Sequence, residues 1–111
     1  MMGICEKIEK KNLLRQRKLL KDAFKGARTI AEILKKRFGA SEVILYGSII
    51  RKNAFNNNSD IDLAVKGLEE NYYRAFGYCI RNSEFELDIK IYEDMPDEFK
   101  KIVDKTGCKI L

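Results

Sequence analysis

The first third of the chain has the hydrophobic spacing of an amphipathic helix. From about Glu6 to Phe38, apolar side chains recur at steps of three and four residues, and Gly39 follows as a C-cap. The front half of this segment is less regular and has no single apolar stripe. One helix of this length would reach about 50 Å, longer than a domain of this size requires. We therefore expect either a break near Asn12 or a front end that projects and packs on another chain.

Three later stretches have the pattern of β-strands. Glu42 to Tyr46 is almost continuously apolar, which is typical of a strand covered on both faces. Asp60 to Lys66 and Glu84 to Tyr92 alternate apolar and polar residues, so each has one apolar and one polar face. The polar faces of these two strands carry three acids, Asp60, Asp62 and Asp88.

Two shorter helices are predicted after the second and third strands. The first runs from Glu69 to about Asn82 and is weakened by Gly77, at a cost of about 1 kcal/mol. The second runs from Met95 to about Lys105 and is capped by Gly107. The expected buried side of the first of these helices consists of four large residues, Tyr72, Tyr73, Phe76 and Ile80.

Between the first two strands the chain turns at Gly47-Ser48, where Ser48 is expected to N-cap a short helical turn, and residues 53–58 form a loop. The element order is helix, strand, strand, helix, strand, helix. We predict a fold of the α/β (α+β) class, in which helices pack on the apolar face of a small sheet and the acid-bearing face stays open.

Length and composition are those of one globular domain, residues 1–111, with 45% hydrophobic and 35% charged residues. No apolar run approaches a membrane span and no signal peptide is evident, so we expect a cytoplasmic protein with no membrane contact. The three cysteines have no metal-site spacing and are expected to be reduced. The absence of histidine excludes Ser-His-Asp and Cys-His catalysis.

The positive charge is concentrated in the N-terminal segment. Residues 1–37 hold twelve Lys/Arg against four Asp/Glu, a balance of +8, so the rest of the chain carries −3 of the total of +5. A solvated helix face is the commoner explanation for such a segment, and nucleic acid is an unlikely partner.

Gly47-Ser48 and the three aspartates together suggest nucleotide chemistry. Backbone N–H groups and a hydroxyl at the end of a strand are suited to hold phosphate. Acids that share one sheet face repel one another unless a cation lies between them. A divalent metal and a nucleoside triphosphate would satisfy both features.

These residues resemble the signature of the DNA polymerase β-like nucleotidyltransferases. Gly47-Ser48, an eleven-residue gap, Asp60-Ile61-Asp62-Leu63 and a later strand acid, Asp88, agree in spacing and order. The context is most similar to minimal nucleotidyltransferase (MNT) domain proteins, over roughly residues 40–111. The resemblance implies a small mixed sheet of the polymerase β palm-like type, with residues 1–39 as an N-terminal helical segment and 40–111 as the catalytic core.

The resemblance also implies roles for the site residues. Asp60, Asp62 and Asp88 would hold two Mg²⁺ ions, and Asp88 could also accept the proton of an attacking hydroxyl. Gly47 and Ser48 would hold the β- and γ-phosphates of ATP.

Two basic residues near these motifs have two candidate roles each. Lys90 is expected either to contact the triphosphate or to neutralise the acids, of which we favour neutralisation. Arg51 is expected either to meet phosphate or to pair with an acid. Lys52 and the three asparagines at positions 56–58 depart from the usual loop of the family.

MNT proteins are commonly paired with HEPN-domain proteins as antitoxin and toxin. The resemblance therefore implies a Mg²⁺-dependent transfer of AMP from ATP to a hydroxyl of a protein partner, with a HEPN-domain protein or a second copy of the chain as the binding partner. Three alternatives stay open: a non-catalytic antitoxin that acts by occlusion, transfer to a small molecule as in aminoglycoside-modifying relatives, and a nucleic-acid acceptor.

Overall fold

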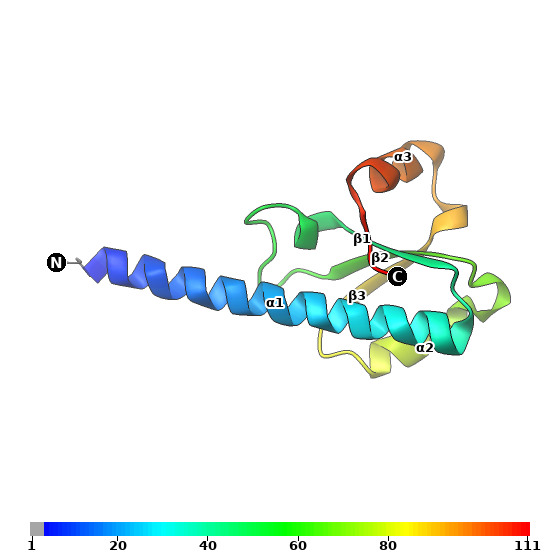
Figure 1. The fold of residues 1–111 in the computed structure, drawn as a ribbon, viewed down its shortest axis with the longest axis horizontal. Coiled ribbons are helices and arrows are strands. Elements are labelled where there is room, and N and C mark those ends of the chain that lie inside the picture. The colour runs from blue at the N-terminus through cyan, green and yellow to red at the C-terminus, as the bar shows by residue number, and fades with distance from the viewer. Residues whose placement is uncertain (1–3) are drawn as a thin grey trace.

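The computed structural model describes the backbone of residues 4–111 and the side chains of residues 14–111. This part of the chain contains three α-helices and four strands, and short 3₁₀ turns join some of them (Figure 1). The elements are α1 (Ile4–Phe38), β1 (Glu42–Tyr46), β2 (Ile61–Lys66), α2 (Tyr72–Arg81), β3 (Leu87–Ile91), α3 (Asp97–Thr106) and β4 (Cys108–Lys109).

The strands form one mixed sheet in the order β3-β2-β1-β4. β1 pairs antiparallel with both β2 and β4, whereas β2 and β3 are parallel. A parallel pair needs a crossover connection, and α2 supplies it between β2 and β3. The small mixed sheet predicted from the sequence is therefore confirmed, and β4 is an additional strand that the sequence analysis missed.

The main core lies between one face of the sheet and the helices α1 and α2. Alternate residues of β1 and β2 point into it, because successive side chains of a strand leave opposite faces. Ile61, Leu63 and Val65 are buried there, as their alternation predicted. α1 contributes Ala27, Ile30 and Leu34, and α2 contributes Ala75 and Cys79.

The opposite face of the sheet is partly covered by α3, whereas the sequence analysis expected all helices on one face and an open acid-bearing face. Ile44 and Ala64 meet Met95 and Val103 in a second, smaller core. Figure 1 shows α3 on the side of the sheet away from α1 and α2. The physical reason is that Ile44 and Ala64 are themselves apolar, so this part of the face must be buried.

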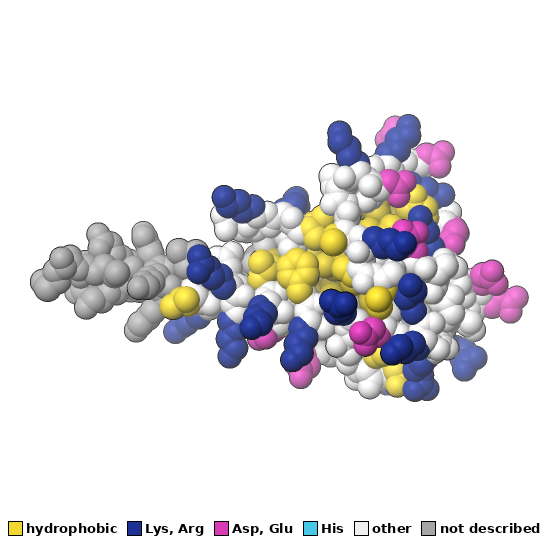
Figure 2. Space-filling model, viewed as in Figure 1, with side chains coloured by type: hydrophobic (Ala, Val, Ile, Leu, Met, Phe, Trp, Pro, Cys, Tyr) yellow, Lys and Arg dark blue, Asp and Glu magenta, His cyan; other side chains and the backbone are white. Residues whose placement is uncertain are grey.

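α1 is one continuous helix and has no break near Asn12. It ends as predicted at Gly39, which has a φ of +74°, and the Ala40 N–H donates to the Leu34 carbonyl (3.0 Å) to close the last turn. Its N-terminal half extends beyond the sheet (Figure 1), and Figure 2 shows Lys and Arg side chains along the part of the helix whose side chains are described. No described helix is both long and apolar enough to cross a membrane.

Several predicted boundaries and faces differ from the structure. α2 buries its small residues Ala75 and Cys79, whereas Tyr73 and Ile80, expected to be buried, are 74% and 58% exposed. Ser48 does not cap the turn that follows β1: this 3₁₀ turn, Gly47–Ile50, begins one residue earlier and has no side-chain cap. β3 is shorter than predicted at both ends, and α3 begins later than predicted.

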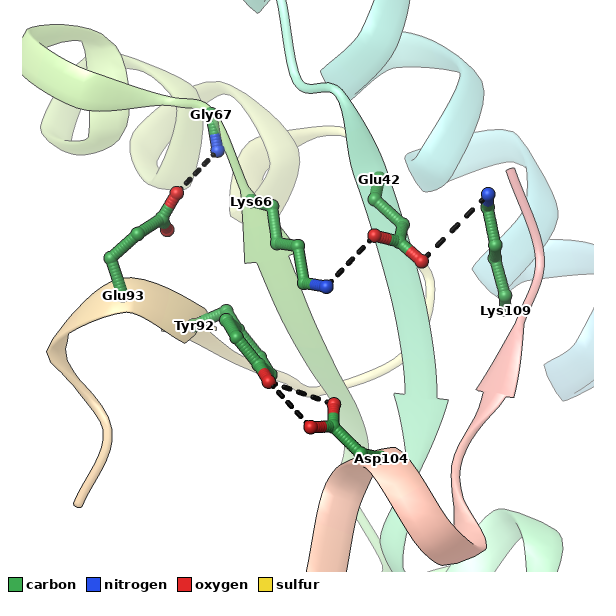
Figure 3. A network of polar contacts seen from close by, with 7 residues as sticks. All are labelled: Glu42, Lys66, Gly67, Tyr92, Glu93, Asp104 and Lys109. Atoms are coloured by element: carbon green, nitrogen blue, oxygen red, sulfur yellow. Dashed lines mark hydrogen bonds and ion pairs between the residues drawn. The ribbon is translucent and has the colours of Figure 1, made fainter. Parts of the chain in front are cut away.

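Polar contacts join β4 and α3 to the sheet at the end away from Asp62 (Figure 3). The Glu42 carboxylate accepts from Lys66 on β2 (2.9 Å) and lies 3.7 Å from Lys109 on β4. The hydrogen bond with Lys66 is the main reason that the pKa of Glu42 is lowered. Tyr92 donates its hydroxyl proton to Asp104 of α3 (2.7 Å). These contacts tie the C-terminal elements to the central strands.

Candidate active site

Strand register brings two of the predicted acids side by side. In the parallel pair of β2 and β3, Asp62 lies directly beside Asp88, and in the antiparallel pair of β1 and β2 it lies opposite Tyr46. Paired residues of neighbouring strands point to the same face. Tyr46, Asp62 and Asp88 therefore form one row across three strands, on the face opposite α1 and α2.

Asp62, at the centre of this row, is half-buried. Its pKa is raised above the ordinary value, first by burial and then by the negative charges of Asp88 and Asp60, while Lys90 opposes the shift. Two neighbouring carboxylates in a partly desolvated position repel each other. A cation bound between them would relieve this repulsion.

Lys90 supplies part of the positive charge that relieves this repulsion. It lies two residues after Asp88 on β3, on the same face, and its Nζ donates to Asp88 Oδ2 at 2.6 Å. This hydrogen bond is also the main reason that the pKa of Lys90 is raised. Both side chains remain more than 40% exposed, so solvent weakens the pair. The geometry matches the neutralising role that the sequence analysis favoured for Lys90.

Gly47 lies directly against the Asp62 carboxylate. It is the first residue after β1 and has a φ of +81°, a left-handed conformation that glycine adopts at little cost. A Cβ built at this position would collide with Asp62 Oδ2. Only a residue without a side chain allows the backbone and this carboxylate to approach so closely.

Ser48 continues the turn that Gly47 begins. It is partly buried, and its carbonyl accepts a hydrogen bond from the Arg51 N–H (3.2 Å). The turn places the Gly47-Ser48 backbone at the end of β1, next to Asp62 of β2, as the sequence analysis expected.

Asp60 and Arg51 lie farther from the row. Asp60 is exposed just before β2, and its charge is one of the smaller influences on Asp62. Arg51 is exposed at a hollow of about 250 Å³ that also involves Arg17 and Lys52, and it forms no ion pair with any described residue. The proposed pairing of Arg51 with an acid is therefore not present in this part of the chain.

Tyr46 is a site residue that sequence reasoning missed. It is buried, with its ring edge-on to that of Phe99 and 5.7 Å between the ring centres. Its hydroxyl, however, is buried without a hydrogen-bond partner among the described residues. Burial is the main cause of its raised pKa, and the nearby Asp62 and Asp88 add to the shift. Only its position opposite Asp62 in the pairing of β1 with β2 could have indicated that Tyr46 belongs to the site.

An apolar hollow of about 400 Å³ opens beside Lys90 at the free edge of β3. Its walls come from α2, the end of β3 and the start of α3, and its size suits a small ligand. Three aromatic side chains line it: Tyr72 and Phe76 of α2, which also pack partly buried against the main core as predicted, and Phe99 of α3.

The acids of the row suit a divalent metal. Asp62 and Asp88 offer neighbouring carboxylate oxygens, which are the ligands that Mg²⁺ prefers, and their mutual repulsion would be relieved by it. Among the side chains of residues 14–111, no three potential ligands are already gathered into a metal-binding group. The acids fit Mg²⁺ as a pair, with Asp60 on the adjoining loop.

The sequence was compared with protein families and with curated proteins. The model of the family described as Polymerase beta, Nucleotidyltransferase matches residues 28–111. The matched region begins within α1 and contains the whole sheet, Gly47-Ser48 and all three aspartates. No curated protein matches the chain.

Proposed function

Because the chain belongs to the polymerase β nucleotidyltransferase family, we propose that it transfers AMP from ATP to a hydroxyl group of a protein partner. The observation that carries this proposal is the row formed by Asp62 and Asp88, with Gly47 cleared of any side chain against the Asp62 carboxylate. Family membership supports nucleotidyl transfer in general, and the row suggests where it takes place.

The proposed reaction is an in-line displacement at the α-phosphorus of ATP. The oxygen of the acceptor hydroxyl forms a bond to this phosphorus, the bond to the bridging oxygen of the β-phosphate breaks, and pyrophosphate leaves. Asp88 accepts the hydroxyl proton. Lys90 Nζ lies 2.6 Å from Asp88 Oδ2 and places a positive charge beside this carboxylate.

Two Mg²⁺ ions would be held by Asp60, Asp62 and Asp88. When bound, they would supply the positive charge that stabilises the triphosphate and the leaving pyrophosphate. The backbone N–H groups of Gly47 and Ser48 are proposed to hold the β- and γ-phosphates, and the position of this turn at the end of β1 beside Asp62 supports this because it would bring the phosphates close to the metal ligands.

The proposed acceptor is a HEPN-domain protein, with this chain as the antitoxin of the pair, or a second copy of the chain. The shape of α1 supports a protein partner, because its N-terminal half extends beyond the sheet and offers a long surface (Figure 1). ATP as substrate and the free thiols of Cys79 and Cys108 fit a cytoplasmic location.

One observation favours a second candidate, a binding module that blocks its partner without catalysis. The Lys90 ammonium already neutralises Asp88, so the acids have a partial counter-charge of the protein's own. In that case the chain would inhibit the partner whether or not nucleotide is present.

The first test is calorimetry of ATP binding, with and without Mg²⁺, on the wild type and on Asp62→Asn. We expect Mg²⁺-dependent binding that is lost in the variant, because half of the central carboxylate pair is removed. Asp22→Asn, an exposed acid of α1, is the matched control and should bind as the wild type does. Equal binding by Asp62→Asn would contradict the site.

The second test is transfer itself. Labelled ATP, Mg²⁺ and a candidate HEPN-domain protein should give a labelled partner with the wild type and none with Asp62→Asn. Inhibition of the partner by Asp62→Asn at full strength, without label transfer from the wild type, would favour the binding module.

A further inference from the structure

A second hollow, distinct from the candidate active site, lies at the C-terminal end of α1 and along α2. Its volume is about 400 Å³. Because α1 and α2 cover the sheet face opposite Asp62 and Asp88, the sheet separates this hollow from the acids. Its lining is basic and aromatic: Arg37, Phe38, Tyr73, Arg74, Gly77, Tyr78 and Arg81.

The three arginines of this hollow have no carboxylate partner within residues 14–111. Arg37, Arg74 and Arg81 are exposed, and none takes part in an ion pair between described residues. Glu70 lies one helical turn before Arg74 but does not pair with it. Three guanidinium groups around one hollow repel one another, and an anion between them would relieve this. Guanidinium groups bind phosphate in a bidentate manner.

Tyr78 holds the side chain of Arg37 in place. Arg37 Nη1 donates to the Tyr78 hydroxyl at 3.0 Å, and the guanidinium carbon lies 4.3 Å from the centre of the Tyr78 ring. Tyr78 is in turn fixed by Phe38, whose ring meets it edge-on at 5.8 Å. A side chain that is already oriented loses less conformational freedom when it binds a ligand.

Gly77 of α2 also lines the hollow. Glycine is unexpected within a helix, where it costs about 1 kcal/mol relative to alanine. A Cβ at this position would lie 3.2 Å from Arg81 Nη1. The missing side chain therefore lets the Arg81 guanidinium fold back over the helix, toward the space that the other two arginines border. A role in ligand binding would account for a residue that otherwise only weakens α2.

We propose that this hollow binds the phosphate of a nucleotide, with the base stacked on Tyr73. Tyr73 is 74% exposed at the rim, and exposed aromatic rings beside arginines are the stacking platforms of nucleotide-binding surfaces. The same chemistry is offered by a free nucleoside monophosphate and by a nucleotide within single-stranded RNA. The site is independent of the transfer reaction proposed above.

The test uses the full chain in a buffer with EDTA, so that the metal-dependent site does not contribute. AMP is titrated by calorimetry, and a short labelled single-stranded RNA is titrated by fluorescence anisotropy. We expect binding of at least one probe, and a shift of the Gly77 amide signal in NMR spectra of the ¹⁵N-labelled protein. Binding of AMP identifies a free nucleotide as ligand, whereas binding of RNA alone identifies the strand.

The variant Arg37→Gln/Arg81→Gln should weaken binding about tenfold or more, because two charged hydrogen-bond donors are lost. Arg15→Gln/Arg28→Gln removes the same charge from exposed positions of α1 outside the hollow and should bind as the wild type does. Equal losses in both variants would show unspecific attraction and overturn the proposal, as would binding of neither probe by the wild type.

Gly77→Ala separates a binding role from a structural one. Alanine favours the helix, so the melting temperature should stay the same or rise, while binding should weaken because Arg81 is displaced. Unchanged binding in this variant would overturn the role assigned to Gly77, whereas the proposed site is decided by the paired arginine variants.

Discussion

At the scale of single residues, Gly47 is where backbone conformation and site chemistry depend on each other. Its positive φ turns the chain out of β1, and its missing side chain leaves room for the Asp62 carboxylate. The motif Gly-Ser could be recognised in the sequence, but the contact with Asp62 depends on the pairing of β1 with β2, which is a tertiary feature.

Gly47→Ala should therefore lower stability and abolish transfer. A left-handed conformation costs alanine about 1–2 kcal/mol, and the collision with Asp62 adds to it. Gly39→Ala is the matched control, because Gly39 has a similar φ of +74° but a Cβ at that position would meet no other atom within 4 Å. Chemical denaturation should show a larger loss for Gly47→Ala, and equal losses would contradict the close approach to Asp62.

Asp62→Asn should stabilise the fold at neutral pH. The ordinary pKa of the carboxyl is 3.8, and in the folded protein it is raised. The folded state therefore holds a proton over a pH range in which the unfolded chain has lost it, so stability falls as the pH rises through the folded pKa. The variant avoids this loss of stability. Its free energy of unfolding should rise by less than about 1 kcal/mol, because solvent screens the site.

The gain should disappear at a pH below 3.8, where Asp62 is protonated in both states. Thermal denaturation of both proteins across this range measures it. A variant that is less stable than the wild type at neutral pH would mean that the Asp62 carboxylate makes stabilising contacts that outweigh the repulsion.

At the scale of elements, the alternation of β2 and β3 predicted correctly which residues face the core. Strict alternation fixes the two faces of a strand, so Asp62 and Asp88 could be placed on one side. The helices were harder. In α2 the expected buried side consists of the largest apolar residues, but Ala75 and Cys79 are the fully buried ones, Tyr72 and Phe76 are only partly buried against the core, and Tyr73 and Ile80 are exposed. Side-chain size alone does not show how near a neighbouring layer lies.

The orientation of α2 predicts unequal thiol reactivity. Burial raises the pKa of Cys79 to about 11, whereas Cys108 is exposed on β4. At mildly alkaline pH, in a Cys5→Ser background, a thiol reagent should modify Cys108 rapidly and Cys79 only as the protein unfolds, because the thiolate is the reactive form. Mass spectrometry after brief alkylation would reveal this.

The further variant Cys5→Ser/Cys108→Ser is the control, and it should resist modification under native conditions. Rapid alkylation of Cys79 in that variant would show that α2 opens readily or that its buried side has been assigned wrongly.

At the scale of the whole molecule, the length of α1 determines the shape. The radius of gyration is 16.1 Å and the longest dimension is 59 Å, whereas a compact chain of this length would have a radius of about 13 Å. The sequence pattern predicted the helix but left open whether it breaks, because the irregular apolar spacing of its first half is compatible with either outcome. The position of α3 on the second sheet face was also not evident, since it depends on β4 returning to β1.

Small-angle X-ray scattering of the 12.9 kDa monomer should give a radius of gyration close to 16 Å. Light scattering on the same sample would verify that it is monomeric. A value near the 13 Å of a compact chain would mean that α1 bends or folds back on the sheet.

The central place of β1 also has a kinetic consequence. One of its neighbours, β2, follows after a single loop, whereas the other, β4, is near the far end of the chain. Closing a long loop costs more entropy, so the pairing with β4 is expected to form after the rate-limiting step of folding. Substitutions that weaken it, such as Lys109→Ala, would then leave the folding rate unchanged and speed unfolding. The lifetime of the native state would thus depend on a strand of two residues that pairs only after the rate-limiting step of folding.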